Sequence, residues 1–143
     1  MKTDPFTEQF ARWASWMHVN LYRLWGGMTP LNRNTLILTT RGRKTGRQIS
    51  KPLVFFKQDD RTFIVASYGG SDRPPAWYLN LVANPEVTVE FGWSRGTYRA
   101  QTLSSEERAQ VWPRLIATYP MYADYQRRTS REIPLVELTS VAR

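Results

Sequence analysis

The chain of 143 residues contains no cysteine, and His18 is its single histidine. Without cysteine there is no disulfide, no thiolate nucleophile and no cysteine-ligated metal. A lone histidine argues against a histidine-based catalytic triad and against a site built from several histidines. We therefore expect no bound metal, and any enzymatic chemistry has to come from other groups or from a cofactor.

Long apolar runs are also missing. No segment approaches the roughly 18 consecutive apolar residues that a membrane-spanning helix needs. Glu8, Arg12 and Arg23 interrupt the N-terminal residues, where a secretory signal peptide would need an apolar core. The sequence therefore predicts a cytoplasmic protein.

Acidic residues are few beside basic ones: 12 Asp and Glu against 20 Lys and Arg, for a formal net charge of +8. Such a balance favours anionic partners, namely a phosphorylated cofactor, a nucleic acid or an anionic membrane surface. Aromatic residues make up 13% of the chain, enough to serve both a core and a flat ligand. The length fits one domain with a substantial core.

The most informative stretch spans residues 35–56, where two extended runs flank the sequence Arg41-Gly-Arg-Lys-Thr-Gly-Arg47. Five cationic side chains and no acid lie between Arg41 and Lys51. Gly42 and Gly46 permit positive φ, which lets backbone N–H groups face an anion. The order of residues does not fit a phosphate-binding P-loop, because a strand pattern rather than a helix follows. The pattern predicts a hairpin whose turn binds an anion, or alternatively a merely solvated, charge-protected hairpin.

Alternating and helical patterns give the remaining elements. We expect a left-handed helix end at Asn84, and a kink or a break at Pro113 in the helix that follows the capping box Ser104–Glu107. Hairpins dominate early and no regular βαβ alternation appears, so the fold class is mainly β (α+β), a small, mostly antiparallel barrel with appended helices. The expected strands are 35–40, 47–57, 62–67, 87–91, 97–103 and 133–141, and the further helices are 76–83 and 121–129.

Within this single domain, we expect residues 1–27 to form an N-terminal amphipathic helix and residues 28–143 to form the barrel. Residues 5–25 carry one apolar stripe at helical spacing. Two interpretations stay open: a helix packed on the domain, or an interfacial helix that rests on the inner face of a membrane.

Two aromatic patches accompany the basic turn. In residues 76–83, the helix start offers N–H groups to an anion, Trp77 and Tyr78 can flank a planar ring, and Asn80 can donate and accept hydrogen bonds. Tyr119, Tyr122 and Tyr125 recur every third residue and so share one helix face. For both patches the alternative is ordinary core packing.

Four stretches taken together carry a resemblance to a known family: LTTRGRKTGR, VASYGG, PAWYLNLVANPEVTVE and YPMYADYQRRTSREIP. From about Leu36 to Leu138 the chain resembles the deazaflavin-dependent nitroreductase and quinone reductase family, whose members are split β-barrels of the FMN-binding type. A departure is Tyr68, which stands between the serine and the glycine pair.

The resemblance implies that reduced coenzyme F-420, a polyanionic deazaflavin, delivers a hydride to quinones, nitroaromatics or activated double bonds. It implies catalytic roles for Tyr122, Ser67, Tyr119 and Tyr125. The implied cofactor-binding residues are Arg43, Lys44, Thr45, Arg47, Lys51, Pro52, Ala66, Ser67, Trp77, Tyr78 and Asn80.

Other functions stay as alternatives. A non-catalytic binder of deazaflavin, flavin or another anion could use the same barrel, and FMN is the less favoured cofactor. Nucleic acid is not expected as a partner, because the cations cluster at a turn instead of alternating with aromatics along a groove. The oligomeric state and the physiological electron acceptor are left open by the sequence.

Overall fold

The computed structural model describes residues 34–141. The division at residue 27 and the predicted helix over residues 5–25 lie outside this part of the chain. The elements in chain order are β1 (Thr35–Arg41), β2 (Gln48–Gln58), β3 (Arg61–Val65), the 3-10 turn η2 (Tyr68–Gly70), α2 (Ala76–Ala83), β4 (Glu86–Phe91), β5 (Ser94–Thr102), α3 (Ser105–Thr118), α4 (Met121–Arg127) and β6 (Leu135–Ser140).

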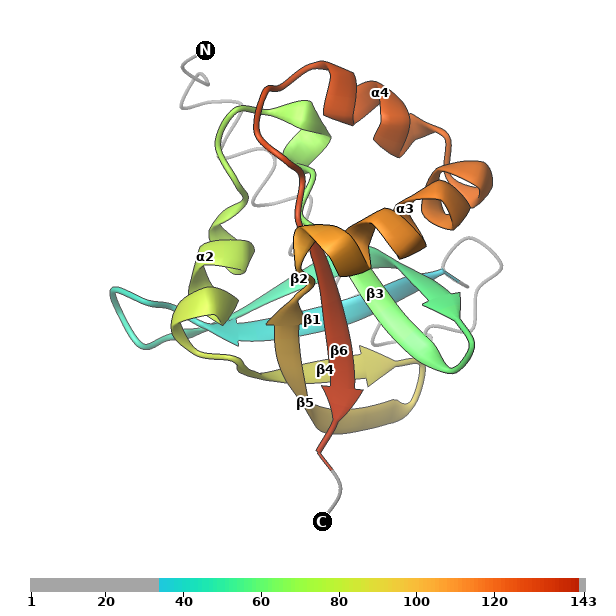
Figure 1. Cartoon of the computed structure of the whole chain (residues 1–143). Helices are drawn as coiled ribbons and strands as arrows, with labels where there is room; N and C mark the ends of the chain where they lie inside the picture. The colour runs from blue at the N-terminus through green and yellow to red at the C-terminus, as the bar shows by residue number, and fades with distance from the viewer. Residues whose placement is uncertain (1–33, 142–143) are drawn as a thin grey trace.

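The strands close into a barrel in the order β1-β2-β3-β6-β5-β4, and every neighbouring pair is antiparallel (Figure 1). The β1–β4 pairing, with Leu38 opposite Val89, closes the ring. The last strand of the chain, β6, lies between β3 and β5. Closure pairs the strand edges that an open sheet would expose, and it confirms the predicted antiparallel barrel.

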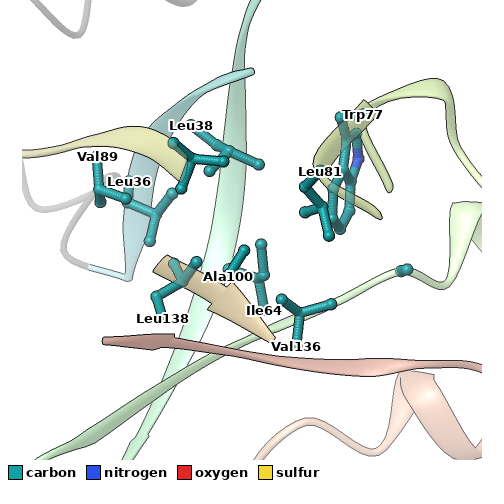
Figure 2. Packing of buried hydrophobic residues seen from close by; sticks show 11 residues of the cluster. Leu36, Leu38, Ile64, Trp77, Leu81, Val89, Ala100, Val136 and Leu138 are labelled. Carbon is teal, nitrogen blue, oxygen red and sulfur yellow. The ribbon is translucent and has the colours of Figure 1, made fainter. Parts of the chain in front are cut away.

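The barrel interior forms one hydrophobic cluster. Inward-facing residues come from every second position of a strand, as Leu36 and Leu38 do on β1. Ile64, Val89, Ala100, Val136 and Leu138 add to the cluster from other strands. Helix α2 covers one side of it, where Trp77 and Leu81 face the interior residues (Figure 2).

A second cluster lies outside the barrel wall, beneath α3 and α4. Phe63 and Val65 of β3 point outward, opposite to Ile64, and meet Leu115 of α3 and Tyr122 of α4. In Figure 1, α4 lies at the top and α3 lies between it and the barrel, and α4 also contacts η2. The described part of the chain thus has two cores that share the strands of one barrel wall.

One local prediction is wrong and another is wrong in part. Helix α3 continues through Pro113, so the predicted break into two short helices does not occur, while the kink stays a prediction. Pro113 and Ala109, four residues before it, are both exposed, so water can satisfy the Ala109 carbonyl oxygen that the missing proline N–H leaves without a partner. Asn84 is extended, with φ −133° and ψ 90°, and not left-handed. It precedes Pro85, which disfavours helical backbone and leads the chain straight into β4.

None of the helices in residues 34–141 has both the length and the apolar character required to cross a bilayer.

Candidate active site

A pocket of about 240 Å³ lies where the two cores meet. Trp77, from the barrel interior cluster, lines one side of it, and Tyr122, from the cluster beneath α3 and α4, lines another. The other lining residues are Pro52, Leu53 and Val54 of β2, Val65 of β3, and Ser67, Tyr68 and Pro75 from the segment between β3 and α2. Most of these lining residues are apolar, and Ser67, Tyr68 and Tyr122 carry hydroxyl groups.

Tyr122 is the buried tyrosine of this site, with 6% of its surface exposed. Burial, helped by the neighbouring phenols of Tyr119 and Tyr125, raises the pKa of Tyr122 to about 12. The phenol therefore stays protonated at neutral pH and is available as a hydrogen-bond donor. It belongs to α4, which the second core holds against the barrel wall.

The three predicted tyrosines come together, but their positions relative to the pocket differ. The ring of Tyr122 packs edge-to-face with Tyr119 at 6.1 Å and with Tyr125 at 6.0 Å between centroids. Only Tyr122 lines the pocket, so Tyr119 and Tyr125 support its ring from either side. Burial also raises the pKa of Tyr119.

Ser67 lines the pocket at the start of an unusual turn. It is 8% exposed, and its side chain does not cap η2. The next three residues have positive φ: Tyr68 at 45°, Gly69 at 64° and Gly70 at 82°. Gly70 is required for close approach, because a Cβ there would lie 2.5 Å from the carbonyl oxygen of Tyr125. The turn is thus pressed against α4, the helix that carries Tyr122.

Arg131 holds this turn in place, and sequence reasoning missed it. Its guanidinium group donates hydrogen bonds to the carbonyl oxygens of Ala66, Ser67 and Ser71. Burial lowers the pKa of Arg131, an effect that Asp72 opposes. No motif signals these contacts, because the bonded groups lie 60 to 65 residues apart in the chain.

Helix α2 carries three predicted cofactor residues with different surroundings. Trp77 lines the pocket, whereas the Tyr78 hydroxyl lies 3.1 Å from Thr102 Oγ1 and the Tyr78 ring packs against the barrel core. The two rings stand nearly perpendicular, at 87°, so they do not form parallel walls for one planar ligand. Pro75 begins the helix without a side-chain cap.

Asn80 is 3% exposed and bonds to the basic hairpin. Its Oδ1 accepts hydrogen bonds from the backbone N–H of Arg43 at 3.2 Å and from Arg43 Nη1 at 3.0 Å. Its Nδ2 donates to Thr40 Oγ1 at 3.4 Å. The Asn80 side chain therefore anchors the turn between β1 and β2 onto α2.

The basic turn presents its charges to solvent. Arg43, Lys44, Thr45 and Arg47 are all exposed. Internal hydrogen bonds shape the turn, from Gly42 N to Arg47 O at 2.7 Å and from Gly46 N to Gly42 O at 2.8 Å.

The two glycines of the turn serve different purposes. Gly46 uses the positive φ that glycine permits, at 72°, and Gly42 does not. The N–H groups of both glycines donate within the turn, so the prediction that they face an anion is wrong. Gly42 is needed for space, since a Cβ there would lie 2.9 Å from Thr45 Oγ1.

Three further predicted residues occupy nearby strands. Pro52 lines the pocket from β2. Lys51 precedes it and pairs in register with Leu38 of β1. Ala66 is fully buried in the barrel core, so only its backbone, the acceptor for Arg131, has a polar role. The structure thus places Pro52, Ser67, Trp77 and Tyr122 around one pocket.

Two larger grooves lie elsewhere on the barrel, of about 640 and 680 Å³. The first reaches from Thr39 and Thr88 to Arg41 and Gly46 of the basic turn. The second lies around Phe55, Phe91 and Tyr98. Neither contains Ser67 or any of the three tyrosines, so the smaller pocket matches the predicted chemistry better.

Comparison with known proteins agrees with this geometry. Residues 14–140 match the family described as F420H(2)-dependent quinone reductase. An F420H(2)-dependent quinone reductase of Mycobacterium tuberculosis (strain ATCC 25618 / H37Rv) is 38% identical over 108 residues, which cover 73% of this chain and 72% of that protein.

Solved structures extend the comparison to three dimensions. A structure described as an F420-H2 dependent reductase is 36% identical, with a TM-score of 0.67 over 74% of this chain and 94% of its own. Another, described as a domain-swapped dimer, is 33% identical, with a TM-score of 0.68 over 86% of this chain and 96% of its own. The chain therefore belongs to the F420H(2)-dependent quinone reductase family, a family of oxidoreductases, which confirms the resemblance, the enzyme class and the cofactor predicted from the sequence.

Proposed function

We propose that this protein uses reduced coenzyme F-420 to reduce quinones in the pocket between Trp77 and Tyr122. The observation that carries the proposal is the position of this pocket relative to the basic turn. Helix α2 contributes Trp77 to the pocket and Asn80 to the turn. These residues are three positions apart, or about 4.5 Å along the helix axis. A pocket with a mainly apolar lining and an exposed cationic turn are therefore joined by about one turn of helix.

The residues fit the chemistry of the cofactor. A pocket of about 240 Å³ is smaller than typical small-molecule sites of roughly 300–1,000 Å³. Its lining residues would border the planar ring system, and the basic turn would hold the phosphate and the oligoglutamate chain. There Arg43, Lys44 and Arg47, all exposed, would bind the anionic groups with charge-assisted hydrogen bonds.

The other cofactor residues remain part of the proposal, with roles suited to their surroundings. Asn80 and Thr45 would act by shaping the turn, since both already bond within it or to it. Tyr78 would support the Trp77 ring by edge contact. Pro52 and Ser67, which line the pocket, would border the ring system directly. Lys51 and Ala66, the residues just before them in the chain, would lie behind this lining.

When bound, the reduced deazaflavin supplies the hydride. The protein supplies orientation, exclusion of water and stabilisation of the negative charge that develops on the acceptor oxygen. Tyr122 would donate a hydrogen bond to that oxygen from a phenol that stays neutral, and Ser67 would offer a second donor. Tyr119 and Tyr125 would keep the Tyr122 ring in place.

A pair of measurements tests the proposal. Reduced deazaflavin and FMN are titrated against the full chain at equal, low salt, and turnover with a soluble naphthoquinone is then followed by deazaflavin absorbance. We expect tighter deazaflavin binding and steady oxidation. Tighter binding of FMN than of deazaflavin would overturn the assignment of coenzyme F-420 as the cofactor. Binding of deazaflavin without turnover would favour the alternative of a non-catalytic binder.

The acceptor range is a separate part of the proposal. Nitroaromatics and activated double bonds should also be reduced, because each places negative charge on a heteroatom that Tyr122 can contact. The same assay with a nitroaromatic or an enone tests this. Turnover confined to quinones would limit the proposal to that class.

Contact of residues 5–25 with the inner face of a membrane, and the cytoplasmic location, stay predictions. Both depend on a segment outside the described residues. Co-sedimentation with anionic vesicles, compared between the full chain and a variant lacking residues 1–25, tests the membrane contact. If both proteins remain in the supernatant, the membrane interpretation is wrong.

A further inference from the structure

We propose that Arg131 is a positioning residue for the reaction, which holds the turn that brings Ser67 and Tyr68 to the pocket. The inference rests on the proposed function for its consequence in catalysis. Its structural half, that Arg131 fixes the turn, stands on the contacts alone and is tested without cofactor.

The Arg131 guanidinium bonds to the turn through three of its nitrogens. Nε donates to the carbonyl oxygen of Ser71 at 2.8 Å, and Nη2 donates to that of Ser67 at 2.9 Å. Both terminal nitrogens also reach the carbonyl oxygen of Ala66, at 3.2 and 3.3 Å. One planar group thus fixes both ends of the segment from Ala66 to Ser71.

The backbone of this turn needs such support. Tyr68 has φ 45°, a conformation that is uncommon for a residue with a side chain, and two glycines with positive φ follow it. Within the turn, Gly70 N donates to Ser67 O at 2.9 Å and Ser71 N to Tyr68 O at 3.1 Å. Strained conformations persist where surrounding contacts determine them. The carbonyl contacts of Arg131 are such contacts.

Arg131 also joins two walls of the pocket. It follows α4, which supplies Tyr122, and it bonds to the segment that supplies Ser67 and Tyr68. A second tether runs in parallel, from Thr129 Oγ1 to Asp72 Oδ1 at 2.8 Å. Loss of the Arg131 contacts would let one wall shift relative to the other while the barrel stays intact.

The role is geometric, because all the acceptors are neutral carbonyl groups. Lysine keeps the charge of arginine but not the planar fork that bonds to three carbonyl oxygens at once. Arg131→Lys therefore separates position from charge. Arg128→Lys is the matched control, since Arg128 contacts the same turn through a single, longer bond of 3.4 Å to Gly69 O.

Amide hydrogen exchange on the full chain without cofactor tests the structural half. In Arg131→Lys we expect the amides of Gly70 and Ser71 to exchange at least about tenfold faster, with barrel amides unchanged. Arg128→Lys should exchange like the parent. Parent-like protection at Gly70 and Ser71 in Arg131→Lys would overturn the proposal. Loss of the folded circular-dichroism spectrum in this variant would overturn it too, because Arg131 would then stabilise the whole fold and not this turn in particular.

A second variant keeps the test sharp. Glycine at position 68 adopts positive φ freely, so the turn should depend less on Arg131 in a Tyr68→Gly background. The added effect of Arg131→Lys on exchange at Gly70 should then be smaller than in the parent. An equal effect in both backgrounds would mean that Arg131 does not support the strained backbone, contrary to the proposal.

Kinetics test the catalytic half. With a soluble naphthoquinone, Arg131→Lys should lower kcat by about tenfold or more, since small displacements of positioning groups have effects of that size. Arg131→Gly should recover part of the rate when guanidinium is added at low concentration. Parent-like kcat in Arg131→Lys, or absence of rescue, would remove the catalytic role. If the parent itself does not turn over, the proposed function fails, while the exchange data still decide whether Arg131 holds the turn.

Discussion

Asn80 accepts two hydrogen bonds from Arg43, one from the backbone N–H at 3.2 Å and one from Nη1 at 3.0 Å. The same amide donates to Thr40 Oγ1, so it bonds to β1 as well as to the turn that follows. Because Asn80 lies on the helix that also carries Trp77, one buried side chain links the basic turn to the pocket. The proposed site of the anionic chain, at the basic turn, and the proposed site of the ring system, at the pocket, are therefore connected through one helix.

We predict that Asn80→Leu weakens deazaflavin binding by about ten- to a hundredfold. This factor corresponds to the loss of one hydrogen bond to a charged group, which contributes roughly 1.5–3 kcal/mol. Leucine keeps the volume but removes the acceptor for Arg43, so the turn loses its anchor. A titration with the reduced cofactor measures the effect, and Tyr78→Phe on the same helix is the matched control. Equal affinities of Asn80→Leu and the parent would show that the turn needs no anchor.

Reversal of charge in the basic turn gives a second prediction. Lys44→Glu should weaken deazaflavin binding strongly at low salt, because it removes a charge-assisted contact and adds repulsion of the anionic chain. Lys57→Glu changes the net charge equally, but Lys57 is near the other end of β2, where it contacts Phe91. Its affinity should therefore stay near that of the parent. If both variants lose affinity equally, net charge and not the turn attracts the cofactor.

Much of the fold was predictable because its signals are local. Alternation located all six strands of the described region to within a few residues, and the capping box of Ser104 and Glu107 formed as expected. The break expected at Pro113 does not occur, because the backbone there is exposed to solvent, and the left-handed end expected at Asn84 is replaced by extended backbone, because a proline follows. The pairing of β1 with β4 and the insertion of β6 between β3 and β5 depend on long-range contacts that local patterns do not encode.

The site was predictable only in part for the same reason. Trp77 and Tyr122 stand out as aromatic residues in helical patterns, Ser67 was implied by the family resemblance, and the structure places all three around one pocket. Asn80 was expected to face the cofactor, yet its oxygen is already bonded to Arg43, a partner 37 residues away. Arg131 gave no signal, since an arginine near the end of a basic chain is usually a solvated charge. Only the fold reveals that its acceptors are carbonyl oxygens of the pocket wall.

The shifted pKa of Tyr122 predicts a specific dependence of stability on pH. Its pKa is about 12 in the folded protein, against 10.0 for an unperturbed tyrosine. Between pH 10 and 12 the unfolded chain loses this proton while the folded chain keeps it. The folded state then binds more protons, so stability falls as pH rises through this window and is unaffected below it.

Urea unfolding of the parent and of Tyr122→Phe, at pH 9 and near pH 11.5, measures this contribution. The phenylalanine variant lacks the titrating group, so the parent should lose about 2 kcal/mol more than the variant over this interval. Other groups titrate in both proteins and cancel in the difference. Parallel losses in the two proteins would mean that the phenol is less buried than the structure indicates.

The same substitution tests the catalytic proposal. Tyr122→Phe keeps the ring between Tyr119 and Tyr125 and removes only the hydroxyl, so kcat/KM for a quinone should fall by about ten- to a thousandfold, as for loss of an oxyanion donor. Deazaflavin affinity should barely change, because we propose that its anionic chain binds at the basic turn and not at Tyr122. Tyr125→Phe, whose hydroxyl does not line the pocket, should keep nearly full activity. Steady-state kinetics with a quinone and a nitroaromatic, together with a cofactor titration, separate the outcomes. If Tyr122→Phe loses affinity for deazaflavin, Tyr122 is a cofactor contact. If Tyr122→Phe keeps full activity, the hydrogen bond to the acceptor comes from Ser67 or from water.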